Sequence, residues 1–447
     1  RRAINPRVAV GTLVIKHILR STDEDTIEFI KENPYLQYFL GYAEYRYEQP
    51  FAASLLVSIR RRLGVEEFDK LTAHFMSQVQ KIEQKIAQKK KQIRSSKDDA
   101  GPAERPSVDA KDVKSETGDS EAENRGHLII DATVSPADIK YPTDLDLLNK
   151  AREKSEYLID LLYVPEKGKT KPRTYRIKAR KAYLSCAKQR KKRRNTLRKA
   201  IKAQLNYLSR NIKSIEKLLD EKGIGVFPLA HKYQKIYWVI QEVYRQQKQM
   251  YDDKSHKTSD RIVSISQPHI RPIVRGKAGK EVEFGAKLSV SLVNGYSYLD
   301  RISWDAYNEG TDLVTQIESY RTRYGCYPEW VSADTIYGSR ENRAYMKKHG
   351  IKYTGLALGR RPKELNQERK ELEAERKKKG RQRSQVEALF GIGKRKYDLD
   401  LVKAKTKQTS ESWIGMVYLV MNIAHFLRVI FWPVLKTIHF YIRKLNE

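Results

Sequence analysis

The stretch "HLIIDATV", residues 127–134, places a single carboxylate, Asp131, inside an otherwise apolar run. The run is short and rich in β-branched residues, and a polar segment precedes it, so it predicts a buried β-strand. A buried carboxylate is costly unless it is paired, hydrogen-bonded or bound to a metal ion. Asp131 is therefore a candidate functional residue, although an acid in this position also serves to cap a helix or a turn.

Two further carboxylates stand in comparable contexts. Asp334 ends a second short apolar strand in "WVSADTIYG" (330–338), and acids at strand ends of an α/β sheet lie where ligands usually bind. Glu387 is the single acid of "RSQVEALFGIGKRK" (383–396). On an ideal helix of about 100° per residue, Arg383, Glu387 and Lys394 share one face. A surface stripe of ion pairs would produce the same pattern.

The three acids together fit one kind of chemistry. Two divalent ions about 3.5–4 Å apart, held by carboxylates, stabilise the attacking and leaving oxygens of an in-line phosphoryl displacement. Magnesium prefers hard oxygen ligands and keeps several waters, so three carboxylates suffice without His or Cys. The sequence thus predicts a centre of two Mg²⁺ ions at Asp131, Asp334 and Glu387, in which Mn²⁺ can substitute.

The charge of the chain indicates a polyanionic partner. Lys and Arg number 88 against 55 Asp and Glu, a formal net charge of +33. Nucleic acid is the leading candidate, with an anionic membrane surface or a ribosomal neighbour as alternatives. A solvated charged helix is the alternative for each basic run. The residues expected to contact the DNA backbone are Arg193, Arg194, Arg198, Lys377, Lys378, Arg383 and Lys394.

The pattern of apolar residues predicts an N-terminal helical domain and an α/β domain, a mixed sheet flanked by helices. Strand signals resume at "RIVSISQ" (261–267) and at 281–304. The most apolar segment, 413–435, predicts a buried core helix because polar residues interrupt it. The predicted parts are residues 1–96 (N-terminal helical domain for DNA binding or dimerisation), 97–126 (disordered linker), 127–435 (catalytic domain), 144–255 (basic helical insertion within it) and 436–447 (C-terminal tail).

Four stretches resemble the DDE transposases of bacterial insertion sequences, specifically the insertion-sequence-five group. They are "ENPYLQYFLG" (32–41), "LIIDATVSPADIKYPTD" (128–144), "SADTIYGSRENRAYMKKHGI" (332–351) and "RSQVEALFGIGKRKYDLDLVKAK" (383–405). The resemblance implies a ribonuclease-H-like domain with Asp131, Asp334 and Glu387 as the catalytic triad. The related signature Tyr-x2-Arg-x3-Glu-x6-Lys matches at its Arg, Glu and Lys, whereas Gly380 stands at the tyrosine position.

The resemblance also implies the activity. We expect a cytoplasmic, nucleoid-associated transposase that cleaves DNA at the ends of its own element and transfers the freed 3′-hydroxyl strand into target DNA. The expected partners are the double-stranded terminal inverted repeats, the target and a second copy in the synaptic complex, with no membrane. A catalytically inactive, sequence-specific DNA-binding derivative is the alternative, towards which Gly380 is the one hint. A basic ribosome- or RNA-associated protein would leave the buried aspartates unexplained.

Overall fold

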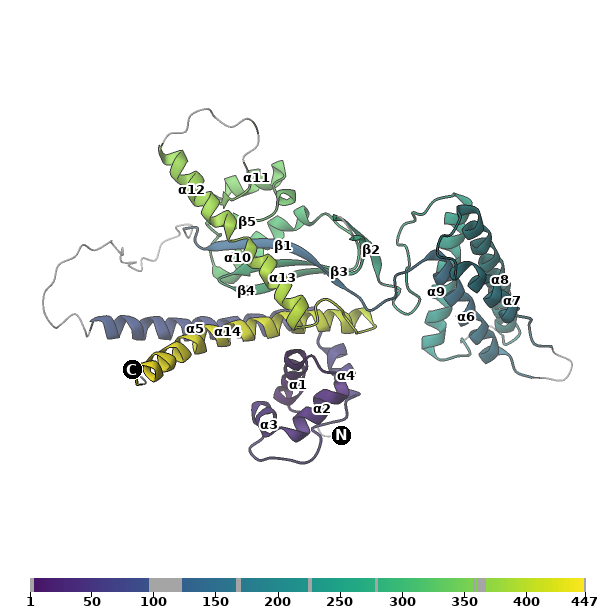
Figure 1. Ribbon diagram of the computed structural model, residues 1–447, viewed down its shortest axis with the longest axis horizontal. Helices are drawn as coiled ribbons and strands as arrows, with labels where there is room; N and C mark the ends of the chain where they lie inside the picture. Colours follow the sequence, from purple (N-terminus) through teal and green to yellow (C-terminus); the bar gives the residue numbers. More distant parts are fainter. Residues whose placement is uncertain are drawn as a thin grey trace.

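The computed structural model describes residues 4–95, 123–165, 170–223, 227–277, 280–356, 359 and 367–445. Its elements form a six-stranded sheet with flanking helices, a group of helices α6–α9 beside the sheet, and an N-terminal helical unit near the last helix (Figure 1). The predicted α/β class is confirmed. Most of the predicted linker, residues 97–122, lies outside the described residues.

The sheet is mixed, and β1 lies near its centre. The strand order is β2-β3-β1-β5-β6, with β4 paired to β3. β1 is antiparallel to β3 and parallel to β5, and β5 is parallel to β6. Antiparallel strands therefore come first along the chain after β1, and parallel strands joined by helices follow. The strands are β1 (His127–Pro136), β2 (Arg271–Lys277), β3 (Lys280–Val293), β4 (Tyr296–Ser303), β5 (Trp330–Ser332) and β6 (Lys352–Tyr353).

The strand signals over 281–304 are confirmed as the hairpin of β3 and β4. Its two turn residues, Asn294 and Gly295, have φ of 52° and 86°. A two-residue hairpin needs positive φ at both positions, and an Asn-Gly pair adopts it at low cost. The local sequence therefore sets both the turn and the register of this hairpin.

The prediction of a strand at 261–267 is wrong, because this segment has no strand partner. Ile262 and Ile265 pack into the core of α6–α9, whereas Val263 packs into the core of the sheet. The backbone N–H of Ile262 donates to Gln246 Oε1 at 2.9 Å. The alternation of apolar residues thus arises because this connecting segment packs against one core on each side.

The two faces of β1 pack against different helices. Leu128 and Ile130 belong to a core formed with α10 and α11, whereas Ile129 belongs to a core formed with α13 and α14. Successive side chains of a strand point to opposite faces, so Asp131 points to the same face as Ile129, towards α13. The helices are α10 (Leu313–Tyr324), α11 (Arg340–Lys348), α12 (Gln367–Arg381), α13 (Ser384–Lys396) and α14 (Lys407–Leu445).

Between β1 and β2 the chain forms a helical unit with a core of its own. Leucine, isoleucine and valine side chains from three of its helices are buried against one another, and Leu148, Leu208 and Ile240 are fully buried. The unit lies to one side of the sheet (Figure 1). Its helices are α6 (Asp144–Leu162), α7 (Arg176–Ala187), α8 (Arg194–Asp220) and α9 (His231–Asp252).

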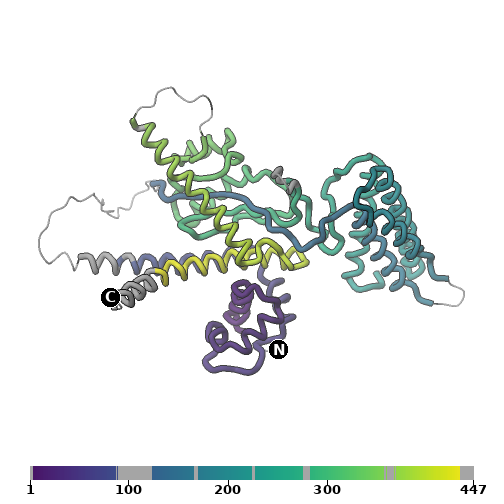
Figure 2. Tube along the Cα trace, viewed as in Figure 1, coloured from purple at the N-terminus to yellow at the C-terminus, as the bar shows by residue number. Residues whose placement is uncertain are grey.

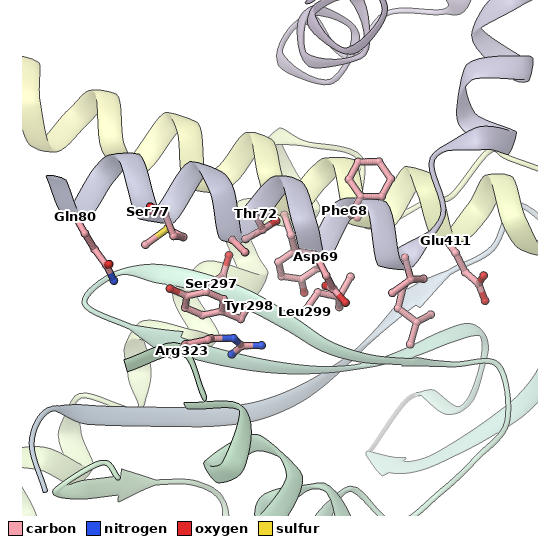
Figure 3. Close-up of a pocket in the computed structure, with 16 residues that line it drawn as sticks. Phe68, Asp69, Thr72, Ser77, Gln80, Ser297, Tyr298, Leu299, Arg323 and Glu411 are labelled. Carbon is pink, nitrogen blue, oxygen red and sulfur yellow. The ribbon is translucent and has the colours of Figure 1, made fainter. Parts of the chain in front are cut away.

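The two ends of the sequence share a core. Leu13 and Leu56 of the N-terminal unit and Phe68 of α5 pack against Met416 and Val420 of α14. Figure 2 shows these first and last segments next to each other. A cavity of about 340 Å³ remains between α5, β4 and α14 (Figure 3). The N-terminal helices are α1 (Pro6–Leu19), α2 (Asp23–Glu32), α3 (Pro34–Leu40), α4 (Leu55–Arg62) and α5 (Val65–Ser95).

The buried core helix predicted at 413–435 is confirmed only for its first part, because Leu427, Val429 and Phe431 further along α14 are exposed. Its residues from Trp413 to Asn422 are buried without exception. Within the described chain, Lys407–Trp432 is the one helical segment long and apolar enough to span a bilayer, and half of its most apolar window is buried in the protein. Asn422 makes hydrogen bonds to Ser297 of β4. A polar group inside this helix therefore has a protein partner.

Candidate active site

The position of Asp131 follows from strand pairing. Its carboxylate is 15% exposed, and its Oδ1 accepts a hydrogen bond from the Ala132 N–H at 2.8 Å. Burial raises the pKa of the Asp131 carboxyl. The bond from Ala132 and the positive charge of Arg383 oppose this shift, whereas the negative charges of Glu309 and Asp334 add to it. The pKa of Asp131 is raised overall, so the effect of burial outweighs the stabilisation that Arg383 gives to the carboxylate.

Asp334 comes next to Asp131 through the parallel register of β1 and β5. Ile129 lies opposite Ser332, so two residues further along each strand bring Asp131 and Asp334 to the same level. Asp334 also caps the short 3-10 helix η2 (Thr335–Tyr337), where its Oδ1 accepts from the Thr335 N–H at 2.8 Å. Asp334 therefore does cap a helix, as the alternative interpretation held, and it also lies at the edge of the candidate site.

Glu387 lies in the first turn of α13 and is joined to Asp131 by one arginine. Arg383 donates from Nη2 to Glu387 Oε1 at 2.8 Å and from Nη1 to Asp131 Oδ2 at 3.4 Å. The helix continues through Gly391 and Gly393 to Lys396. Gly391 lies one turn beyond Glu387 and lines the same pocket. Its missing side chain leaves the helix face open there.

One pocket collects these groups. It has a volume of about 720 Å³ and is lined by Asp131, Asp334, Glu387, Arg383 and Lys394. The structure therefore brings together the three predicted acids and two of the predicted cations, from a strand, a strand end and a helix that are distant in sequence. The shared face that the helical period predicted for α13 is the face towards the pocket.

The remaining predicted cations lie elsewhere. Arg193 and Arg194 are exposed at the start of α8, and the Arg198 guanidinium lies 4.0 Å from the centroid of the Tyr251 ring. Lys377 and Lys378 are exposed on α12. None of these five residues lines the pocket. They belong to two separate basic surfaces, on the helical unit and on the helix that precedes α13.

Sequence reasoning missed two residues of the pocket, Glu309 and Lys287. Their side chains form an ion pair of 2.7 Å and are 20% and 14% exposed, respectively. Glu309 lies in "YNEGTD" (307–312), a short segment after the strand signal at 281–304 that shows no strand or helix period of its own. The pattern around it could not single it out, because its place depends on how this loop packs against the turn that carries Asp334.

The donor set of the pocket suits a hard divalent cation. Carboxylate oxygens are the ligands that Mg²⁺ prefers, and one or two of them per ion suffice when waters and substrate phosphates complete the shell. Across the described residues, no three His, Cys, Asp or Glu side chains are close enough together to hold a single ion. Asp131 and Asp334, adjacent through strand register, are the pair best placed to share one.

The fold and this pocket define a class of protein: an α/β sheet with one carboxylate within a central strand and another just after the neighbouring strand, facing a basic helix that carries a further acid. Comparison with known families makes the class specific. Residues 331–424 match a family model described as a transposase DDE domain, and residues 1–62 match a transposase domain of the DUF772 family. Two separate stretches of the chain are thus similar to domains of transposases, the proteins of DNA transposition and insertion sequences.

One relative is described as an uncharacterized protein, ORF8 in the nfe locus of Rhizobium meliloti. It is 28% identical over 151 residues, which cover 34% of this chain and 56% of that protein. The chain therefore spans about half the length of the curated relative it matches. No solved structure matches the chain. The matches do not distinguish the insertion-sequence-five group from other transposases.

Proposed function

We propose that the protein is a metal-dependent transposase that cleaves DNA at the ends of an insertion sequence and joins them to target DNA. The observation that carries the proposal is the pocket at which Asp131, Asp334 and Glu387 meet Arg383 and Lys394. A ribonuclease-H-like fold accords with the mixed sheet order and with the place of one acid on β1 and another just after the parallel strand β5.

The carboxylates have separate tasks in this proposal. Asp131 and Asp334 would hold divalent ions between them, and Glu387 would complete the shell of a second ion. When bound, such ions act as Lewis acids that stabilise both the attacking and the leaving oxygen of a phosphodiester displacement. Mg²⁺ is the expected ion, with Mn²⁺ as a substitute.

The cations of the pocket position the DNA. Arg383 already carries positive charge between Asp131 and Glu387, so it can move its guanidinium to a phosphate once another cation neutralises these acids. Lys394 lies two turns further along the pocket face of α13 and can bind a neighbouring phosphate. Contacts of this kind orient the strand without reading its sequence.

The helical unit would hold the DNA outside the pocket. From Glu166 to Glu216 the intervening sequence contains no Asp or Glu but many Lys and Arg residues. Arg193 and Arg194 are exposed in this stretch, and Lys377 and Lys378 form a second exposed basic surface near α13. Such surfaces bind phosphates and release counterions. We expect terminal repeats and target DNA as partners, a second copy in the complex that pairs two ends, and a cytoplasmic location.

The proposal is tested with the full chain and a DNA duplex taken from the genomic sequence that flanks its gene. In Mg²⁺ or Mn²⁺ the wild type should nick at a 3′ end, and Asp131→Asn should not. Asp305→Asn serves as the matched control, because Asp305 is 73% exposed and outside the pocket. Equal nicking by Asp131→Asn and the wild type would remove Asp131 from the mechanism.

The alternative function gives a different result. Gly380 lies on α12, and a Cβ atom there would come no closer than 3.8 Å to Thr354, so the backbone at this position does not itself require glycine. A protein that had lost catalysis would bind the same duplex tightly without cutting it in either metal. That outcome would favour the inactive DNA-binding derivative.

A further inference from the structure

The 3-10 helix η1 (Glu309–Asp312) lies directly against η2, the turn that Asp334 caps. Asn342 of α11 joins the two turns, because its Nδ2 donates to the Gly310 carbonyl at 2.7 Å and to the Tyr337 carbonyl at 2.9 Å. A Cβ atom at Gly310 would come within 2.6 Å of the Ile336 carbonyl oxygen. Only a glycine allows the backbones to approach this closely. The position of Glu309 relative to Asp334 is therefore fixed by buried backbone contacts.

Glu309 is paired to a lysine from a third element. Lys287 of β3 donates to Glu309 Oε2 at 2.7 Å and to the Tyr307 carbonyl at 2.9 Å. β3 is paired to β1, and Lys287 lies opposite Val134 in the register. Both members of the ion pair line the pocket of Asp131, Asp334 and Glu387. Because both are mostly buried, water screens their attraction less than it would at the surface.

On both sides of the pocket, a basic side chain is paired with an acid. In one half Arg383 bridges Asp131 and Glu387, and in the other Lys287 neutralises Glu309. A carboxylate that the fold holds in the same pocket as Asp131 and Asp334 is positioned to bind a cation other than its lysine.

We propose that Glu309 is a fourth carboxylate of the metal centre, and that Lys287 competes with the divalent cation for it. The inference rests on the proposed function, because it assumes that the pocket binds divalent ions. Lys287 would release Glu309 when that carboxylate holds a divalent cation, and its ammonium could then bind a DNA phosphate. Glu309 therefore raises the affinity of the pocket for the divalent cation, and Lys287 lowers that affinity because it competes for the same carboxylate.

The test is a titration of the full chain with Mn²⁺ alone, without DNA, by isothermal titration calorimetry. Glu309→Gln keeps the shape of the side chain but removes its charge, and we expect about tenfold weaker binding of Mn²⁺, as for other groups around a metal centre. Lys287→Met removes the competing charge, so it should tighten binding several-fold. In the Glu309→Gln background, Lys287→Met should change the affinity little. This double variant has neither charge, so an unpaired lysine does not disturb its folding.

The outcomes separate the two proposals. If Asp131→Asn and Asp334→Asn leave Mn²⁺ binding unchanged, the metal centre itself is wrong. If those variants lose binding while Glu309→Gln binds like the wild type, only the inference about Glu309 fails. The inference about Glu309 would also fail if Lys287→Met tightened Mn²⁺ binding equally in the wild type and in the Glu309→Gln background, since the lysine would then act through another group. Asp305→Asn again controls for the loss of one surface charge.

Discussion

Asn422→Leu is a substitution for which local sequence and tertiary structure predict opposite signs. Asn422 lies in the apolar part of α14, where leucine has the higher helix propensity and would extend an uninterrupted apolar run. On sequence grounds the change should stabilise the helix. In the structure, however, Asn422 is 1% exposed and its side chain serves as the partner of Ser297, which is fully buried.

The magnitude follows from three hydrogen bonds. Asn422 Oδ1 accepts from the Ser297 N–H at 2.8 Å and from its hydroxyl at 3.0 Å, and Asn422 Nδ2 donates to the Ser297 carbonyl at 2.7 Å. Leucine would leave a buried N–H and a buried C=O without partners, at about 1–3 kcal/mol each. Added apolar burial returns about 1–2 kcal/mol. Taking the middle of each range, the net loss in the free energy of unfolding is about 2.5 kcal/mol.

The assay is urea unfolding of the full chain, followed by tryptophan fluorescence. Asn422→Leu should lower the midpoint of the transition while the slope stays the same. Met421→Leu is the matched control, because Met421 is also buried in α14 and the change conserves its volume, so it should cost less than about 1.5 kcal/mol. A variant Asn422→Leu as stable as the wild type would show that Ser297 finds other partners, and would refute the reasoning.

Three further outcomes are expected. Burial lowers the pKa of His17 to about 3, so the folded protein favours the neutral imidazole. The folded state is therefore most stable above the unfolded pKa of about 6.5, and it loses stability as the pH falls below that value. Between pH 7 and pH 5 the wild type should lose about 2 kcal/mol more than His17→Phe in parallel urea titrations, and equal losses would contradict a neutral buried imidazole. Arg193→Ala/Arg194→Ala should reduce the slope of log affinity for duplex DNA against log salt by up to about 1.8, measured by fluorescence anisotropy, and an unchanged slope would remove both residues from the DNA surface. Gly285→Ala should destabilise the sheet by about 3 kcal/mol, because its Cβ atom would come within 2.1 Å of the Ser135 carbonyl oxygen, and thermal unfolding at the wild-type temperature would argue against that contact.

Local patterns were sufficient for most elements of the α/β part. The strand signals over 281–304 predicted the two strands, which the Asn294-Gly295 turn joins because such a pair tolerates two positive φ values. The apolar runs at 127–134 and 330–333 identified β1, which carries Asp131, and β5, which ends two residues before Asp334. The run at 261–267 had a similar appearance but is not a strand, since apolar alternation reports two-sided burial and does not reveal whether a neighbouring strand is present.

The sequence by itself determined the class of this protein and the acids worth examining. A carboxylate in an apolar strand is conspicuous because its burial is costly, and the period of a helix placed Glu387 on one face with Arg383 and Lys394. These are properties of neighbouring residues, and they can be deduced without knowing what lies across the fold.

The tertiary structure alone decided what those acids meet. Parallel pairing set Asp131 level with Asp334, and the packing of one 3-10 turn on another brought Glu309 and its lysine into the same pocket. The same holds for Asn422, whose partner Ser297 lies far away in the sequence. Strand register and the contacts of an irregular loop depend on long-range packing, and no local period of the sequence encodes them.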